Sequence, residues 1–290
     1  MTVSPYAFAK SGGKATRATM QDASGAKVIG GEVAAEGAWP WQVALIVADA
    51  VGAESQFCGG SLVLDQWVLT AAHCIHIQER DGGFSDLRPD EFSVLAGTSA
   101  LAPGKGDPIP VEAEFRHPSY APDIFDFDIA LIKLARAPGV PDKTIEVPDA
   151  EYGSLLNRQG VTTIVTGWGL QEGARPSPEL RQAQIQILHR NLCNAALLEA
   201  RAEETTGGFA FAAQTLGVGE DDAYAVWDEL LAQAPEPMSE NLICLGTFEG
   251  GRTSCSGDSG GPLFVPAGGW VLHPGPDRQL GPDRRNRPRL

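Results

Sequence analysis

The stretch Cys255-Ser-Gly-Asp-Ser-Gly-Gly-Pro262 sets the hydroxyl of Ser259 inside a run of glycines, directly after the carboxylate of Asp258. Glycine backbones adopt conformations that other residues avoid, so the amide groups of Gly257 and Ser259 can converge on one point. Two converging N–H donors stabilise the oxyanion of a tetrahedral intermediate in acyl transfer. The stretch therefore indicates a nucleophile beside an oxyanion hole, and a glycine-rich turn without chemistry is the alternative interpretation.

Two upstream segments offer the partners that activate a serine hydroxyl: a base within hydrogen-bond reach and a third group that orients the base. His73 follows a strand-like run at residues 67–70 and precedes Cys74, so it is a candidate base. Asp126 and Asp128 stand at the mouth of an apolar strand-like run, and either carboxylate could orient the imidazole. The order along the chain is histidine, aspartate and serine.

A histidine beside a cysteine also has a structural or a metal-binding interpretation. His73 and His76 have a spacing that could suit zinc, but no second Cys/His pair follows at a suitable interval. We therefore favour the catalytic interpretation and expect neither a metal nor a cofactor.

The chain resembles the chymotrypsin-like (trypsin-fold) serine endopeptidases from about residue 28 to about residue 272. Besides the segments above, the resemblance rests on Val28-Ile-Gly-Gly31, Trp39-Pro-Trp-Gln-Val-Ala-Leu45, Cys58-Gly-Gly-Ser-Leu-Val63 and Thr166-Gly-Trp-Gly169. It implies an all-β fold of two packed six-stranded antiparallel Greek-key barrels. It also implies a serine endopeptidase that works through an acyl-enzyme on Ser259. The wording Asp-Ile-Ala-Leu selects Asp128 over Asp126, so the implied triad is His73, Asp128 and Ser259.

Composition agrees with a body built from many short strands. The chain has 290 residues, 43% of them hydrophobic, with 34 glycines and 21 prolines. Strand-like runs recur at residues 42–47, 68–70, 92–96, 129–134, 162–166 and 182–188, and no apolar run reaches transmembrane length. A formal charge of −15 and a pI near 4.7 argue against a nucleic-acid partner. We expect a monomer that acts on protein or peptide substrates and has no membrane partner.

The chain holds five cysteines, an odd number. By spacing and resemblance, Cys58 pairs with Cys74 and Cys193 pairs with Cys244, which implies an oxidising compartment. We therefore expect a secreted or periplasmic protein. Cys255 is left over, because the resembled family supplies its partner downstream and this chain does not.

Residues 1–27 are polar and hold no apolar segment of signal-peptide length. We interpret them as an activation segment that ends at Lys27, with a disordered leader as the alternative. In the resembled family, cleavage frees an α-amino group that pairs with the aspartate preceding the nucleophile. The resemblance thus implies an ion pair between Val28 and Asp258, and an intact chain that is a zymogen.

Substrate preference in the resembled family is set near the floor of the primary pocket, six positions before the nucleophile. Thr253 occupies that position here. An uncharged hydroxyl cannot supply the countercharge that a Lys or Arg side chain needs, so we expect a preference for small or apolar side chains. Cleavage after Lys27 would then need another, activating protease.

An insertion lies at about residues 194–238, between Cys193 and Cys244, where the resembled family has a shorter segment. Residues 194–203 and 221–232 have helical composition, and one helical face carries Tyr224, Trp227, Leu230 and Leu231. We expect a helical hairpin that packs its own apolar stripe. A rim that shapes the substrate cleft is the alternative.

The sequence departs from the family after residue 272. Residues 273–290 contain five arginines, two aspartates and four prolines, a composition for which we expect a disordered basic tail without ladder strands. The second barrel would then be incomplete and would lack a segment that forms a pocket wall in the family. Residues 28–272 are the expected protease domain. A catalytically inactive homologue, truncated or serving as a binding module, is the alternative function.

Overall fold

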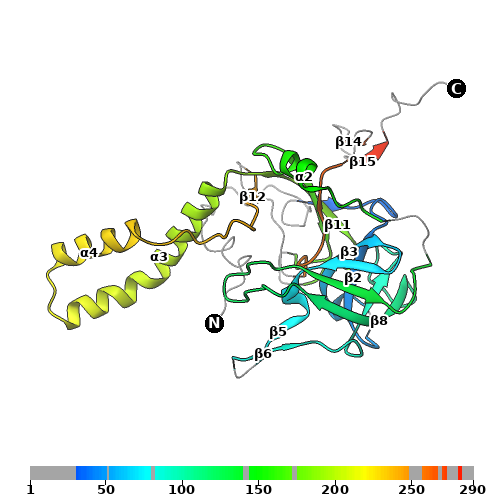
Figure 1. Ribbon diagram of the computed structural model, residues 1–290, viewed down its shortest axis with the longest axis horizontal. Helices are drawn as coiled ribbons and strands as arrows, with labels where there is room; N and C mark the ends of the chain where they lie inside the picture. The colour runs from blue at the N-terminus through cyan, green and yellow to red at the C-terminus, as the bar shows by residue number, and fades with distance from the viewer. Residues whose placement is uncertain are drawn as a thin grey trace. The chain divides into compact units, whose positions relative to one another are not determined.

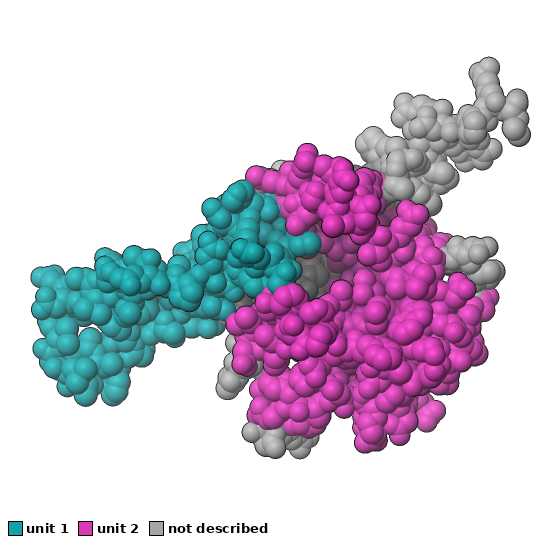
Figure 2. All heavy atoms as spheres, viewed as in Figure 1, with its two compact units in different colours: residues 1–22, 188–244 teal, residues 23–187, 245–290 magenta. Residues whose placement is uncertain are grey.

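The computed structural model describes residues 31–50, 52–79, 82–139, 144–171, 175–247 and 257–266, together with the strands at 270–272 and 280–282 (Figure 1). Its contacts divide the chain into two compact units (Figure 2). The larger unit, residues 23–187 and 245–290, holds every described strand. Among the described residues, the smaller unit is the segment 188–244, which carries two long helices.

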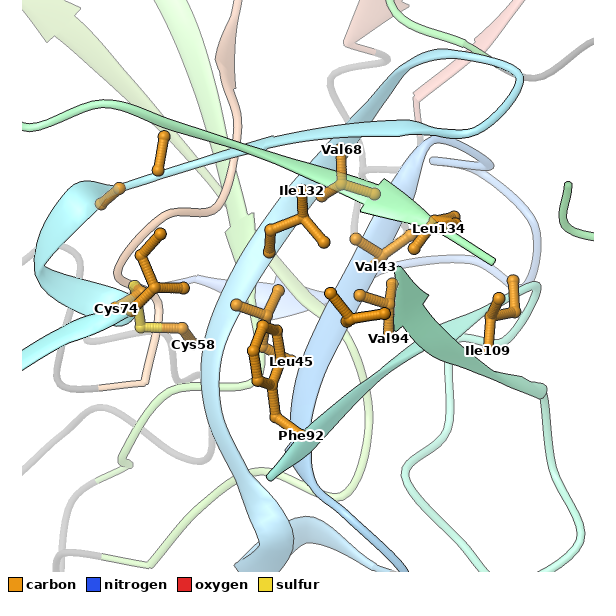
Figure 3. Close-up of a cluster of buried hydrophobic side chains, with 14 of the residues drawn as sticks. Val43, Leu45, Cys58, Val68, Cys74, Phe92, Val94, Ile109, Ile132 and Leu134 are labelled. Atoms are coloured by element: carbon orange, nitrogen blue, oxygen red, sulfur yellow. A yellow bond between two sulfur atoms is a disulfide. The ribbon is translucent and has the colours of Figure 1, made fainter. Parts of the chain in front are cut away.

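Six antiparallel strands of the larger unit close into a barrel. In spatial order they are β2 (Gln42–Val47), β3 (Gln56–Leu64), β4 (Trp67–Thr70), β9 (Ala130–Leu134), β8 (Asp107–Arg116) and β7 (Phe92–Ala96). Because side chains alternate along a strand, every second residue points inward. Val43, Leu45, Val94 and Ile132 are fully buried in this way (Figure 3).

The second sheet has five strands. Its order is β1 (Glu32–Val33), β11 (Arg181–Ile187), β10 (Thr162–Gly167) and β13 (Leu263–Phe264), and β12 (Leu245–Gly246) also pairs with β11. Trp168, Leu180 and Phe264 pack there against Trp39 and its neighbours. The all-β prediction is confirmed, with one closed six-stranded barrel and, within the described residues, a second sheet that does not close.

Shorter elements lie between the strands of these sheets. They are two 3-10 turns, η1 (Ala53–Ser55) and η2 (Ala72–Cys74), the hairpin β5 (His76–Gln78) and β6 (Phe84–Asp86), and the helix α2 (Ala150–Leu156). The Asp149 side chain caps α2 by accepting the Tyr152 N–H at 2.8 Å.

The expectation that residues 273–290 contain no strand is wrong at one place. β15 (Leu280–Pro282) pairs antiparallel with β14 (Trp270–Leu272). In a two-stranded sheet both strands are edges, where a proline need not remove a ladder hydrogen bond. The prediction from composition therefore missed the strand formed by the short segment Leu280–Pro282.

The smaller unit consists mainly of α3 (Arg190–Thr215) and α4 (Glu220–Ala232). α4 matches the predicted helix, whereas α3 extends well beyond the predicted 194–203. Phe209 and Trp227 join the two helices, with ring centroids 4.9 Å apart. None of the helices in the described part of the chain combines the length and apolar character that a membrane crossing requires.

The predicted apolar stripe on α4 is only partly packed. Trp227 and Leu231 are half-buried, but Tyr224 and Leu230 are 62% and 55% exposed. Successive residues turn by about 100° around a helix, so these four side chains span a wide arc. Within this unit, α3 covers the middle of that arc and leaves its flanks exposed.

Candidate active site

His73 and Asp128 contact each other twice. The His73 backbone N–H donates to Asp128 Oδ1 at 2.8 Å, and His73 Nδ1 lies 2.6 Å from Asp128 Oδ2. η2, which follows β4, holds the histidine, and Asp128 stands just before β9, which pairs with β4. A carboxylate at Nδ1 fixes the ring and directs Nε2 toward another partner.

The loop before Asp128 explains why this carboxylate faces His73. Phe125 and Phe127 both adopt positive φ angles, 53° and 51°, which turn the chain sharply. The backbone of Asp126 pairs with Ala121, at 3.0 Å from the Ala121 N–H to the Asp126 carbonyl. Of the two aspartates that the sequence left open, Asp128 is the one with the hydrogen bonds to His73 described above.

A disulfide between Cys58 and Cys74 ties β3 to η2 directly beside His73 (Figure 3). The two sulfurs and the His73 ring lie within 4.8 Å of one another. Because both sulfurs are bonded to each other, neither is available as a thiolate ligand for a metal. The second predicted disulfide, Cys193–Cys244, is also present and closes the base of the helical unit.

His76 belongs to a different pair. Its Nδ1 lies 2.5 Å from Asp86 Oδ1, and its ring stacks on Phe84. Arg116 Nε approaches the same Asp86 oxygen at 3.3 Å. Partial burial raises the pKa of Asp86, but hydrogen bonds from His76 and Arg116 outweigh it and hold the pKa below its ordinary value.

This depressed pKa predicts a small, pH-dependent effect of Arg116→Gln. The contribution of Asp86 to stability is present above its unfolded pKa, near 3.8, and is lost as the pH falls through the lower folded value. Asp86 is half exposed, so we expect a loss of less than about 1 kcal/mol at pH 7. Urea unfolding at pH 7 and at low pH would check this. A difference that persists in full below the folded pKa would contradict it.

Tyr120 is a buried neutral neighbour of this region. Its side chain is 7% exposed and meets the His76 ring edge-on, with centroids 5.9 Å apart. Burial raises the pKa of Tyr120, and the negative charge of Asp128 raises it further. The phenol therefore stays protonated and adds no second negative charge beside the His73–Asp128 pair.

The turn that carries Ser259 packs on β3 and β4. The Ser259 carbonyl accepts the Gly59 N–H at 2.7 Å. Thr70, which donates its hydroxyl to Gly59 at 2.8 Å, lies three residues before His73. Within the described residues no hydrogen bond joins the Ser259 hydroxyl to the His73 ring, and such bonds often tighten only when substrate binds.

Gly260 allows this close packing, and Gly260→Ala is expected to destabilise the protein. Gly260 has φ +74°, and a Cβ there would overlap Thr70 Oγ1 and lie 2.7 Å from the Gly59 carbonyl. We expect about 1–2 kcal/mol from the left-handed backbone and about 1–3 kcal/mol from overpacking. Urea denaturation measures the sum.

Gly37→Ala is the matched control, because Gly37 has a similar φ of +69° and nothing within 4 Å of its Cβ position. It isolates the backbone cost from the packing cost. If Gly260→Ala and Gly37→Ala destabilise the protein equally, the Ser259 turn is not closely packed against β3 and β4.

Asp258 is buried at 6% exposure, and its Oδ1 accepts the Gly169 N–H at 2.7 Å. A Cβ at Gly167 would overlap this carboxylate, and one at Gly169 would lie 2.6 Å from it. The Thr166-Gly-Trp-Gly169 segment therefore makes room for Asp258. In the sequence, the two glycines on either side of Trp168 indicated that another group packs closely there. The pattern did not reveal that this group is the Asp258 side chain.

Gln56 is a further residue that sequence reasoning missed. It is buried on β3, and its Nε2 donates to the Gly257 carbonyl at 2.6 Å. Four residues to which the sequence assigned roles, Lys27, Val28, Thr253 and Cys255, lie outside the described residues.

Comparison with known proteins places the chain in a family. The trypsin family model matches residues 28–273. The chain is 30% identical over 249 residues to trypsin of Simulium vittatum, covering 86% of this chain and 82% of that protein. It is 29% identical to transmembrane protease serine 9 of Rattus norvegicus and 28% identical to ovochymase of Halocynthia roretzi. These matches cover 85% and 83% of this chain, but the chain spans only 19% and 12% of those two proteins.

The chain belongs to the trypsin family of serine proteases. Membership supports serine endopeptidase function in general. The two disulfides and the trypsin-family relatives are consistent with a secreted or extracellular protein, although the name of one relative describes a transmembrane protease.

Proposed function

We propose that this protein is a serine endopeptidase that hydrolyses peptide bonds through an acyl-enzyme on Ser259. The observation that carries the proposal is the double contact between His73 and Asp128, at 2.8 and 2.6 Å. Support comes from the Ser259 turn, whose backbone bonds to β3 within the same barrel. The family provides the reaction class.

In the first half of the reaction, Ser259 Oγ attacks the substrate carbonyl carbon and its proton passes to His73 Nε2. Asp128 remains ionised and stabilises the imidazolium that forms. The N–H groups of Gly257 and Ser259 would receive the oxyanion. The intermediate then collapses, the C–N bond breaks, and His73 returns the proton to the leaving amine. Water repeats these steps on the acyl-enzyme and restores Ser259.

The intact chain is proposed to be a zymogen cleaved after Lys27. The burial of Asp258 supports this part, because an ion pair in a buried site is strongly destabilised when one partner is removed. Gly169 donates to Asp258 Oδ1 at 2.7 Å, and the freed α-amino group of Val28 would add an ion pair to this carboxylate. Since Thr253 is uncharged, we propose a separate activating protease. Efficient self-cleavage of purified protein after Lys27 would contradict that specificity.

A fluorophosphonate probe tests the proposal directly, because it reacts only with an activated serine. We expect labelling of the protein cleaved after Lys27, and none of the intact protein or of cleaved Ser259→Ala. Circular dichroism confirms folding of each sample. If the folded and cleaved wild-type protein stays unlabelled, the endopeptidase proposal is wrong and the alternative, a catalytically inactive homologue, is favoured.

A further inference from the structure

The side-chain amide of Gln56 is hydrogen-bonded to the proposed oxyanion loop (residues 257–259), which lies far from Gln56 in the sequence. Its Nε2 donates to the Gly257 carbonyl at 2.6 Å, over a separation of 201 residues. Gln56 is 9% exposed and lies at the start of β3. Among the side chains that the structure describes, it is the one that donates a hydrogen bond to Gly257.

Gly257 needs an external hold because its own backbone is permissive. Its φ of +94° lies in a region that L side chains rarely adopt, and a Cβ there would lie 3.1 Å from Gly169 Cα. A glycine in such a conformation can leave it at little steric cost. Rotation about the Gly257 backbone changes the orientation of the two peptide groups that flank it relative to each other, and one of these groups carries the Gly257 N–H.

β3 holds the loop at two points. Gln56 binds the Gly257 carbonyl, and three residues later the Gly59 N–H binds the Ser259 carbonyl at 2.7 Å. The peptide group that carries the Ser259 N–H lies between these two carbonyls. Contacts with one strand of the closed barrel therefore hold the Ser259 N–H from both sides, and they hold the peptide group that directly follows Gly257.

We propose that Gln56 is a positioning residue for the oxyanion hole, acting through the Gly257 carbonyl. The inference rests on the proposed function and adds a residue to the same site. A neutral amide suits this role, because it donates to the carbonyl without bringing a charge near the developing oxyanion. An apolar side chain of similar length would fill the space but donate nothing.

The kinetic test compares Gln56→Met with wild type after cleavage at Lys27. We expect kcat on peptide ester substrates to fall about 10- to 100-fold with little change in KM, less than the loss of an oxyanion donor itself. A peptide aldehyde, which forms a tetrahedral adduct, should lose affinity by the same factor. The product peptide acid should keep its affinity. Equal losses for both ligands, or a kcat within twofold of wild type, would overturn the proposal.

Gln182→Met is the matched control. Gln182 is also a buried glutamine, 5% exposed, but it accepts from Trp39 Nε1 at 2.7 Å and donates to Glu32, away from the proposed oxyanion loop. We expect this substitution to lower the melting temperature. It should not weaken binding of the peptide aldehyde relative to binding of the product peptide acid. A merely structural role for Gln56 would give the same pattern as Gln182.

Backbone amide exchange decides the role of Gln56 without turnover. In cleaved Ser259→Ala protein, Gln56→Met should raise exchange in residues 257–262 about tenfold or more, and Gln182→Met should not. Unchanged exchange would overturn the proposal. Failure of the fluorophosphonate test with a positive exchange result would instead overturn the endopeptidase function, so the two failures are distinguishable.

Discussion

Replacing Ser259 by alanine in the cleaved protein is expected to lower kcat by a factor on the order of 10^6, and His73→Ala should cost about as much. The physical reason is that the hydroxyl and the imidazole act as one unit, so removing either leaves only the oxyanion donors and substrate binding. For the same reason the double variant should be no slower than either single variant. Initial rates on a peptide ester, with active-site titration, measure all three.

Asp128→Asn extends this test to the orienting carboxylate. The amide keeps the shape of the side chain but favours the wrong imidazole tautomer at His73 Nδ1, and we expect a loss of about 10^4 in kcat. Ser119→Ala, on an exposed surface position, is the control for general effects of substitution. If the kcat of His73→Ala is within tenfold of the wild-type value, His73 is not the general base.

Replacing Asp258 by asparagine is the second change with a large expected effect. The asparagine oxygen can still accept the Gly169 N–H, but the negative charge is lost. The α-ammonium of Val28 would then have no countercharge in a buried site, and breaking a buried pair costs about 3–5 kcal/mol. The active population should fall about 10^2- to 10^4-fold.

The measurement is the rate of fluorophosphonate labelling for protein cleaved after Lys27. Intact Asp258→Asn and intact wild type should be equally unreactive, because neither has the free amine. Asp65→Asn, at an exposed turn, is the matched control. If cleaved Asp258→Asn is labelled at the wild-type rate, activation does not depend on a charge at Asp258.

The features that the sequence predicted well are those encoded locally. The short apolar runs at 42–47 and 92–96 predict strands, because runs of this length and composition are typical of buried strands. The helical composition of 221–232 marked α4 to within one residue. The two disulfides were predicted from cysteine spacing together with the family resemblance, and both are present.

The features that the sequence did not predict depend on which surfaces meet. The exposed Tyr224 and Leu230 on α4 carry a normal amphipathic pattern, but the pattern does not reveal how much of the stripe a partner helix covers. The β14–β15 pairing was missed for a related reason. Composition disfavours strands near prolines, whereas the pairing depends on a neighbouring segment.

By itself the sequence determined the chemistry available to this protein: a serine among glycines, a histidine beside a cysteine, an aspartate before an apolar strand, and the strands of a β fold. Only the tertiary structure decided which groups touch. The contacts of His73 with Asp128, of Asp258 with Gly169 and of Gln56 with Gly257 span 55, 89 and 201 residues. Strand register and barrel closure create such contacts, and these arise from packing between distant segments rather than from any local pattern.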